Sequence, residues 1–337
     1  MSSDFGYVNA RVRGMASRLL GPETFSAAMA AEDFRGFTAV LAQSSYAAAL
    51  DEASASESGL RAVDRALSDD FHATTQSLLR FSDGAPRAMI AAILRRYDLG
   101  DLKTVARAHH AGRDPAELGE ALSGAGELRP STIEALTQAP DLPTAAQALA
   151  VTKHPLAPAF TRAARRYSSD GDLFAFELAL DLAYFSELAE AAAGPHGTEA
   201  YRDAVRREID AANLRTALKV AGSAIDAEGL FIDGGREISK ERFLELAVSG
   251  LDGLASIASG TFAPVAQADD LAAAERGIRN ALDASARRAA LRDPLGIGVV
   301  LRYLRSKETE AAKLRLLARG AFYRVPRTEI EKELGHA

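Results

Sequence analysis

Apolar residues recur at intervals of three and four along almost every long segment of the chain. The clearest example is residues 173–192, where one helical face carries Phe176, Leu180, Tyr184, Leu188 and Ala191. The acidic residues Glu177, Asp181 and Glu187 lie off this stripe. Ala, Leu, Arg and Glu dominate the composition and β-branched residues are sparse, which favours helices over strands. The pattern predicts an all-α protein whose long helices each bury one face.

Local signals mark several helix ends and argue against a sheet. Pro22 and the pair Asp293-Pro294 match the preference for proline in the first turn of a helix, so we expect helices to start there. The best strand candidate is residues 229–236 (GLFIDGGR). Its apolar run leads directly into Asp-Gly-Gly, which is more typical of a loop between helices than of a hairpin.

The chain contains an internal repeat of about 108 residues. Five positions of the first unit recur 108 residues later with similar side chains: Pro22, Thr24, Phe25, Leu41 and Tyr46 become Pro130, Thr132, Ile133, Leu149 and His154. A further 108 residues leads from Leu149 and His154 to Ile257 and Phe262. Each copy predicts two short helices that end before an aromatic or imidazole ring.

A second repeated element lies towards the end of each unit. It reads DLGDLKT at 98–104, DAANLRT at 210–216 and EAAKLRL at 310–316. In a helix the acid lies four residues before the Leu and on the same side, while the following basic residue is rotated by about 100°. One interpretation is a core Leu with charges that define the helix edge, and the other is a binding role. Both stay open from the sequence.

These repeats predict three similar helical domains, at residues 1–115, 116–224 and 225–337. The period is longer than the roughly 20–50 residues of common solenoid repeats, so those architectures are excluded. Three such units can stack in a row or close around a pseudo-threefold axis. Periodicity does not choose between the two arrangements.

Composition and charge exclude several classes of protein. The 337 residues carry 40 Lys and Arg against 46 Asp and Glu, a net charge of −6 that disfavours a nucleic-acid interface. The absence of Cys removes disulfides, thiolate nucleophiles and Cys-based metal sites. The longest apolar runs fall far short of the ~18–20 residues that cross a bilayer, and the first residues show no secretory signal. We expect a cytoplasmic protein.

No motif in the sequence indicates catalytic or cofactor chemistry. The chain has no phosphate-binding loop, dinucleotide fingerprint or nucleophile elbow, and its His residues show no HExxH spacing. His109 and His110 are adjacent, so they face different sides of a helix and make a poor metal site. We therefore expect no catalytic residue, no cofactor and no metal.

Basic residues form the most suggestive surface pattern. The C-terminal series Arg302, Arg305, Lys307, Lys313, Arg315 and Arg319 and the pair Arg287-Arg288 could form a face for an acidic partner. A solvated helix face is the simpler interpretation of such a charge series. The sequence therefore offers a candidate docking face without establishing it.

Five blocks in order resemble the C subunit of bacterial and archaeal V/A-type rotary ATPases, which is similar to the d subunit of the eukaryotic vacuolar ATPase. They are YVNARVRGMASRLL at 7–20, RRYDLGDLKTVARA at 95–108, FELALDLAYF at 176–185, EIDAANLRTALKVAG at 208–222 and DPLGIGVVLRYLRSKETEAAKLRLLARGAFYRVP at 293–326. The resemblance spans essentially the whole chain. Asp101, where that family tends to have Asn, and Leu182, where it usually has a basic residue, depart from the pattern.

The resemblance implies a pseudo-threefold, funnel-shaped, all-helical rotor subunit without a catalytic site. Such a protein is a socket in the central stalk, which seats the central shaft, made of the D and F subunits, on the membrane proteolipid ring. It transmits torque between ATP hydrolysis or synthesis and proton or sodium transport. One copy per complex would lie on the cytoplasmic side of the plasma membrane, held peripherally through the membrane sector.

The matched blocks also suggest which residues hold the rotor together. We expect seven of them to mark either interdomain packing or the rotor interfaces, with packing favoured: Tyr7, Asn9, Arg11, Arg13, Asn213, Arg215 and Arg315. Two other functions stay open at this point. One is a helical adaptor unrelated to ATPases, and the other is an enzyme that uses carboxylates or His in a central cavity.

Overall fold

The computed structural model of the chain describes residues 5–114, 118, 122–194 and 197–335. These residues form α-helices and short 3-10 turns, and no strand occurs among them, which confirms the predicted all-α class. The segment at 229–236 is a short 3-10 turn, η2 (Glu228–Leu230), followed by non-helical chain. The prediction of a loop between helices at that place is therefore confirmed.

Short helices lead into pairs of long helices three times along the chain. The first run contains α1 (Gly6–Ala16), α2 (Pro22–Ala30), α3 (Phe34–Leu41), α4 (Ala47–Ser54), α5 (Gly59–Arg80) and α6 (Gly84–Ala111). The second contains α7 (Pro130–Thr137), α8 (Leu142–Val151), α9 (Ala157–Asp170), α10 (Leu173–Ala193) and α11 (Glu199–Val220). The third contains α12 (Lys240–Ser249), η3 (Gly250–Gly253), α13 (Leu254–Ile257), η4 (Gly260–Gln267), α14 (Leu271–Arg292), α15 (Ile297–Tyr323) and the final α16 (Arg327–Gly335).

Two predicted helix starts have different outcomes. Helix α2 begins at Pro22, as proline at the first helical position predicts. The start expected at Asp293-Pro294 is wrong, because α15 begins at Ile297. The carbonyls of Pro294 and Gly296 face α1 and accept hydrogen bonds from its side chains, so this stretch forms the turn between α14 and α15.

Four of the five residues in the predicted stripe on α10 are buried and the fifth, Ala191, is half-buried. The acids beside the stripe are not simply solvated. Phe176, Leu180, Tyr184 and Leu188 are all 6% exposed or less. The acids on the flank form ion pairs with α6, the neighbouring long helix: Glu177 with Arg107, Asp181 with Lys103 and Glu187 with Arg95. Hydrophobic burial and a row of cross-helix charges therefore join α6 to α10.

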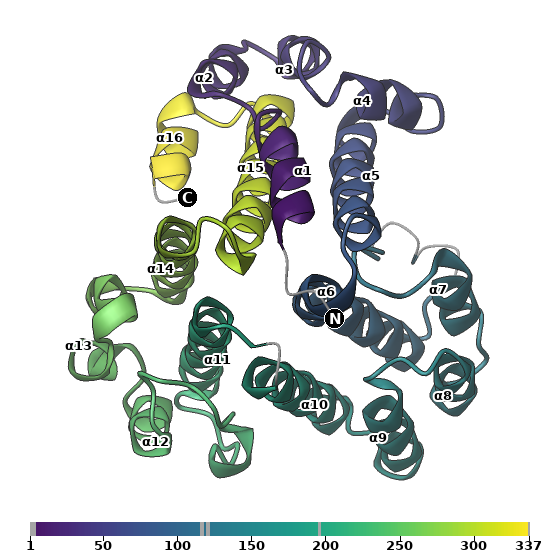
Figure 1. Cartoon of the computed structure of the whole chain (residues 1–337), viewed down its shortest axis with the longest axis vertical. Helices are drawn as coiled ribbons and strands as arrows, with labels where there is room; N and C mark the ends of the chain where they lie inside the picture. Colours follow the sequence, from purple (N-terminus) through teal and green to yellow (C-terminus); the bar gives the residue numbers. More distant parts are fainter. Residues whose placement is uncertain (1–4, 115–117, 119–121, 195–196, 336–337) are drawn as a thin grey trace.

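Buried apolar side chains gather in three clusters. Figure 1 labels the α-helices that contribute to them. One unites α2–α5 with the C-terminal half of α15 and α16. The largest joins α1, the end of α5, α6–α10 and the first half of α11 to the start of α15. The third fills the space between the second half of α11, α12, α13, η4 and α14. Helix α15 returns the chain to its beginning, where it contacts α1, α2, α3 and α5.

Candidate functional site

Helix α1 is attached to the turn between α14 and α15 by two of the predicted residues. The amide Nδ2 of the buried Asn9 donates to the carbonyl of Gly296 over 3.1 Å. Arg13 donates from Nη2 to the carbonyl of Pro294 over 2.6 Å. The two residues lie one helical turn apart, so one face of α1 binds both carbonyls. They connect the first helix to the last third of the chain.

The other two predicted residues of α1 surround the ring of Phe81, at the end of α5. The guanidinium of Arg11 lies 4.2 Å from the ring centroid, which is a cation–π contact. Tyr7 meets the same ring edge-on at 6.5 Å between centroids, and its side chain remains 63% exposed. Arg11 and Tyr7 therefore pack against α5 while leaving surface open to solvent.

Asn213 is buried at the joint between α11 and the following segment. Its Nδ2 donates to the carbonyl of Ile232 over 2.8 Å, and its Oδ1 accepts from the backbone N–H of Ile232 over 2.9 Å. The side chain therefore satisfies both backbone groups of one residue in the loop at 229–236. This pairing explains why an amide suits position 213.

Arg215 and Arg315, which hold the same place in the repeat, each bind a neighbouring long helix. Arg215 of α11 donates from Nε to both carboxylate oxygens of Glu275 on α14, at 3.0 and 2.9 Å. Arg315 of α15 donates to Ser68 of α5 over 3.1 Å, and its Nε lies 3.6 Å from Asp64. Both side chains contact another helix of this same chain.

The acid of the first repeated element, Asp98, is fully buried and binds the segment that enters α7. It accepts from the backbone N–H groups of Glu127 and Leu128 at 2.9 and 3.0 Å. The ring of His154 lies 3.2 Å from the same carboxylate through Nε2. Because the N–H of Leu156 donates to Nδ1 of that ring, the neutral tautomer carries its proton on Nε2 and donates it to Asp98.

Asp210 repeats this arrangement at the segment that enters α12. It is fully buried on α11 and accepts from the backbone N–H groups of Arg236, Glu237 and Ile238, each at 3.0 Å. A carboxylate that accepts several backbone N–H bonds fixes the path of the chain around it. Asp210 therefore acts as the anchor of the third short-helix segment.

Glu310 of α15 is the third acid, and it binds the segment that enters α2. Its Oε2 accepts from the backbone N–H of Leu20 over 2.6 Å, across 290 residues of sequence. Its Oε1 accepts from the hydroxyl of Tyr46 at 2.8 Å and from Lys307 at 2.9 Å. Lys307 also forms an ion pair of 2.8 Å with Asp70 on α5. The sequence placed these acids beside core Leu residues but gave no sign of their backbone partners.

Burial and neighbouring charge shift the pKa values of these groups in definite directions. Burial raises the pKa of Asp101 to about 6. The hydrogen bonds that Asp101 accepts from the backbone N–H groups of Ser123 and Gly124 act in the opposite direction but are outweighed. Burial alone would lower the pKa of Lys307, but the charges of Glu310 and Asp70 outweigh it and raise that pKa. Lys307 therefore stays charged inside the cluster.

A further ion-pair cluster, absent from the sequence predictions, joins the three acid-bearing helices to one another. Arg96 of α6 pairs with Glu308 of α15, and Arg305 of α15 pairs with Glu208 of α11. Burial alone would raise the pKa of Glu208, but the charges of Arg305 and Arg96 lower it below its usual value. Arg305 belongs to the basic series noted in the sequence, but its partner lies 97 residues away, and the partner of Arg96 lies 212 residues away.

The C-terminal basic series divides into paired and unpaired cations. Arg305, Lys307, Arg315 and Arg319 bind acids or hydroxyls of α5, α11 and α15. Arg302 and Lys313, together with Arg287 of α14, make no hydrogen bond or ion pair within the described chain. The series is therefore partly a set of internal contacts and partly an open basic surface.

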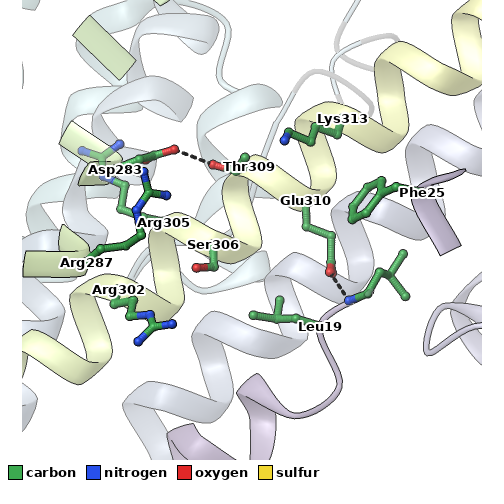
Figure 2. Close-up of a pocket in the computed structure, with 11 residues that line it drawn as sticks. Leu19, Phe25, Asp283, Arg287, Arg302, Arg305, Ser306, Thr309, Glu310 and Lys313 are labelled. Atoms are coloured by element: carbon green, nitrogen blue, oxygen red, sulfur yellow. Dashed lines mark hydrogen bonds between the residues drawn. The ribbon is translucent and has the colours of Figure 1, made fainter. Parts of the chain in front are cut away.

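The unpaired cations line a groove beside α15, which we call the α15 groove (Figure 2). It consists of two adjoining pockets of about 190 and 330 Å³ that share Leu19, Arg302 and Ser306. Its further lining comes from α1, α2, α14 and α15 and includes Val12, Phe25, Arg287, Val299 and Lys313. Glu310 and Leu20, which are joined by a hydrogen bond, also line the groove.

The described residues contain no cluster of metal ligands and no single helix that could cross a membrane. No group of three or more His, Asp or Glu side chains there could hold a metal ion. None of the helices described is by itself long and apolar enough to span a membrane, although the bent pair Lys240–Ile257 and Gly260–Gln267 meets that test when its two parts are combined.

Comparisons with known proteins agree over the whole chain. The family described as ATP synthase (C/AC39) subunit matches residues 8–333. The C subunit of the V-type ATP synthase of Thermus thermophilus is 36% identical over 334 residues, which cover 99% of both chains. The corresponding protein of Deinococcus radiodurans is 35% identical over 99% of this chain and 92% of its own. The C subunit of the A-type ATP synthase of Halorubrum lacusprofundi is 28% identical over 99% of this chain and 98% of its own.

These matches cover every helix of the repeat and leave no segment that calls for another family. An adaptor unrelated to ATPases is inconsistent with them. The relatives are named as subunits of an ATP synthase, which agrees with an accessory rather than a catalytic chain. The chain belongs to the ATP synthase (C/AC39) subunit family.

Proposed function

We propose that this chain is the non-catalytic rotor subunit that connects the central shaft of a V/A-type ATPase to its membrane proteolipid ring. The shaft consists of the D and F subunits, and the connection transmits torque between ATP hydrolysis or synthesis and proton or sodium transport. The observation that carries the proposal is the end-to-end match with V-type ATP synthase relatives, which covers 99% of both chains in one of them.

The contacts between the long helices support the proposal that this subunit resists twisting. Each of the acids Asp98, Asp210 and Glu310 attaches a long helix to the segment before a set of short helices. The pairs Arg96–Glu308 and Arg305–Glu208 then connect those three long helices to one another. Because close-packed interiors do not deform continuously, torque applied to one helix is passed to the others.

We further propose that the three repeats form a pseudo-threefold funnel. In this arrangement the units at 1–115, 116–224 and 225–337 each contribute their last long helix to the packing of the next unit. The contacts of the three acids support this arrangement. Asp98 of α6 binds the second unit, Asp210 of α11 binds the third, and Glu310 of α15 binds the first. An experimental map in which the units do not superpose by a threefold rotation would contradict this arrangement.

The seven residues singled out in the sequence fit packing within this rotor subunit. Six of them form a hydrogen bond, an ion pair or a cation–π contact within the chain: Asn9, Arg11, Arg13, Asn213, Arg215 and Arg315. Tyr7 packs on Phe81 and leaves most of its side chain exposed, and Arg11 and Arg13 are exposed as well, so these three residues of α1 retain surface for a partner. Charge reversal at Arg315 should therefore lower stability and leave the binding of shaft and ring unchanged.

Native mass spectrometry of the detergent-solubilised complex, purified through a tag after Ala337, tests the proposed function. We expect one copy of this chain together with the D and F subunits and a proteolipid ring, held peripherally on the cytoplasmic side of the plasma membrane. Recovery of the chain alone, or with unrelated soluble proteins, from membranes whose ATPase is intact would overturn the assignment.

A further inference from the structure

The α15 groove has one apolar wall and one basic wall. Leu19 and Phe25 line one side, and Figure 2 shows them across the pocket from Arg287 and Arg302. In the adjoining pocket Val12 and Val299 continue the apolar lining as far as the start of α15. The groove is therefore amphipathic along its length.

The basic wall carries charge that the chain itself does not neutralise. Arg287 and Arg302 are exposed, Lys313 is half-buried, and none of the three has a hydrogen bond or ion pair within the described residues. Elsewhere on α15, Arg305, Lys307 and Arg319 have acidic partners. Two acids line this groove. Glu310 forms an ion pair with Lys307, and Asp283 accepts a hydrogen bond from Thr309 and keeps its charge, so the cations of the lining outnumber the acids.

The dimensions suit a short helix. The groove follows α15 from Val299 to Lys313, and at 1.5 Å per residue that stretch is about 21 Å long. A helix laid along it would contribute about four turns. Amphipathic helices bind grooves of this kind through apolar residues spaced at three and four, with flanking charges that select the partner.

We propose that the α15 groove binds an acidic amphipathic helix at the end of the central shaft. This inference rests on the proposed rotor function, and it assigns the chemistry of one interface. Apolar side chains of the helix contact Leu19 and Phe25, while its Asp or Glu residues pair with Arg287 and Arg302. A single groove suits a partner present once, as a shaft is, whereas a ring presents the same surface many times.

The position of the groove gives this contact a structural consequence. Glu310 lines the groove and holds the N–H of Leu20, so an occupant lies against the place where the end of the chain meets its beginning. Ligands that bind only the folded form stabilise it by mass action. Shaft binding should therefore strengthen the contact between α15 and the segment before α2.

Paired charge reversals in the full-length chain test the assignment. R287E/R302E alters the groove, and R162E/R165E on α9 is a matched control that reverses two exposed arginines far from it in the sequence. Affinity is measured for the purified complex of the D and F subunits, and separately for the detergent-solubilised ring, at low and high salt. Thermal unfolding of each variant, together with R287Q/R302Q as a milder change, separates loss of binding from loss of fold.

We expect R287E/R302E to weaken shaft binding by about tenfold or more at low salt and to reduce its salt dependence. The control pair should change shaft binding by less than about twofold, and ring binding should stay the same in both. Equal shaft affinity for wild type and R287E/R302E overturns the groove assignment alone. Loss of ring binding with shaft binding intact assigns the groove to the ring and also overturns it. A wild-type chain that binds neither shaft nor ring overturns the rotor function itself.

Discussion

The joints made by Asp98 and Asp210 differ in chemistry from the joint made by Glu310. The first two hold segments about 30 residues further along the chain, and their acids accept mainly backbone N–H groups. Glu310 holds Leu20, which is 290 residues away, and it is surrounded by Lys307, Tyr46 and Asp70. We call the first two the sequential joints and the third the closing joint.

Chain connectivity explains this difference. Closing a loop of 290 residues costs about 2 kcal/mol more in chain entropy than closing one of about 30. In a sequential joint the acid and the segment that it binds are only about 30 residues apart in the chain, so hydrogen bonds from neutral backbone donors are sufficient. The closing joint unites the two ends of the chain and carries an additional buried lysine, whose charge-assisted hydrogen bonds are stronger than neutral ones. The comparison shows that equivalent positions of a repeat can meet different demands.

Removal of the acid from a sequential joint should have the largest effect. D210A leaves the N–H groups of Arg236, Glu237 and Ile238 without their acceptor, and we expect the free energy of unfolding to fall by about 4 kcal/mol. Chemical denaturation measures the loss. D210N, which keeps one acceptor, is the control and should cost about half as much. A loss under about 1 kcal/mol would remove Asp210 as the anchor.

Removal of the cation from the closing joint should come next. K307M leaves Glu310 and Asp70 buried or half-buried without their counter-charge, and we expect a loss of about 3 kcal/mol in the free energy of unfolding. K307M/E310Q removes both charges and should be less destabilising than K307M alone, since no uncompensated Glu remains. If the double variant is the less stable of the two, charge balance is not what the closing joint provides.

The sequence predicted the all-α class and the buried face of the long helices because helical burial follows a local period. The stripe on α10 and the repeated spacing from Asp98 to Leu102 could both be read from neighbouring residues. The partners of the acids could not, because Leu20 and Glu310 are brought together only by the path of the whole chain. For the same reason, the sequence did not predict the contact partners of the six site residues that bind other parts of the chain.

The basic series on α15 illustrates a second feature that the sequence could not predict, which is the pairing of its charges. Periodicity places Arg302, Arg305 and Lys313 on one helix, but it does not reveal which of them meets an acid from another helix. The structure pairs Arg305 with Glu208 and leaves Arg302 and Lys313 open among the residues that it describes. A charge pattern alone therefore cannot separate an internal ion pair from a docking surface.

The next largest effect is a pH dependence of stability that Asp101 should cause. The folded-state pKa of Asp101 is about 6, above the unfolded value of about 3.9, so its contribution to stability is complete below pH 4 and is lost as the pH rises through about 6. Asn213, the equivalent residue, does not titrate. We expect D101N to become more stable relative to wild type by about 2 kcal/mol between pH 4 and pH 7. Urea unfolding at several pH values measures it, and a constant difference would contradict the raised pKa.

The smallest expected effect tests whether the closing joint is energetically separate from the sequential ones. Y46F removes the hydroxyl that joins Glu310 to Lys307 and should cost about 1 kcal/mol. H154F, at the same repeat position, removes the bond to Asp98 and the acceptor of the Leu156 N–H, and it should cost at least as much. In a K307M/E310Q background the cost of Y46F should largely disappear, because its partners are changed, whereas the cost of H154F should persist. Contacting groups couple and distant ones add, so an equal reduction of both costs would mean that the joints respond as one unit.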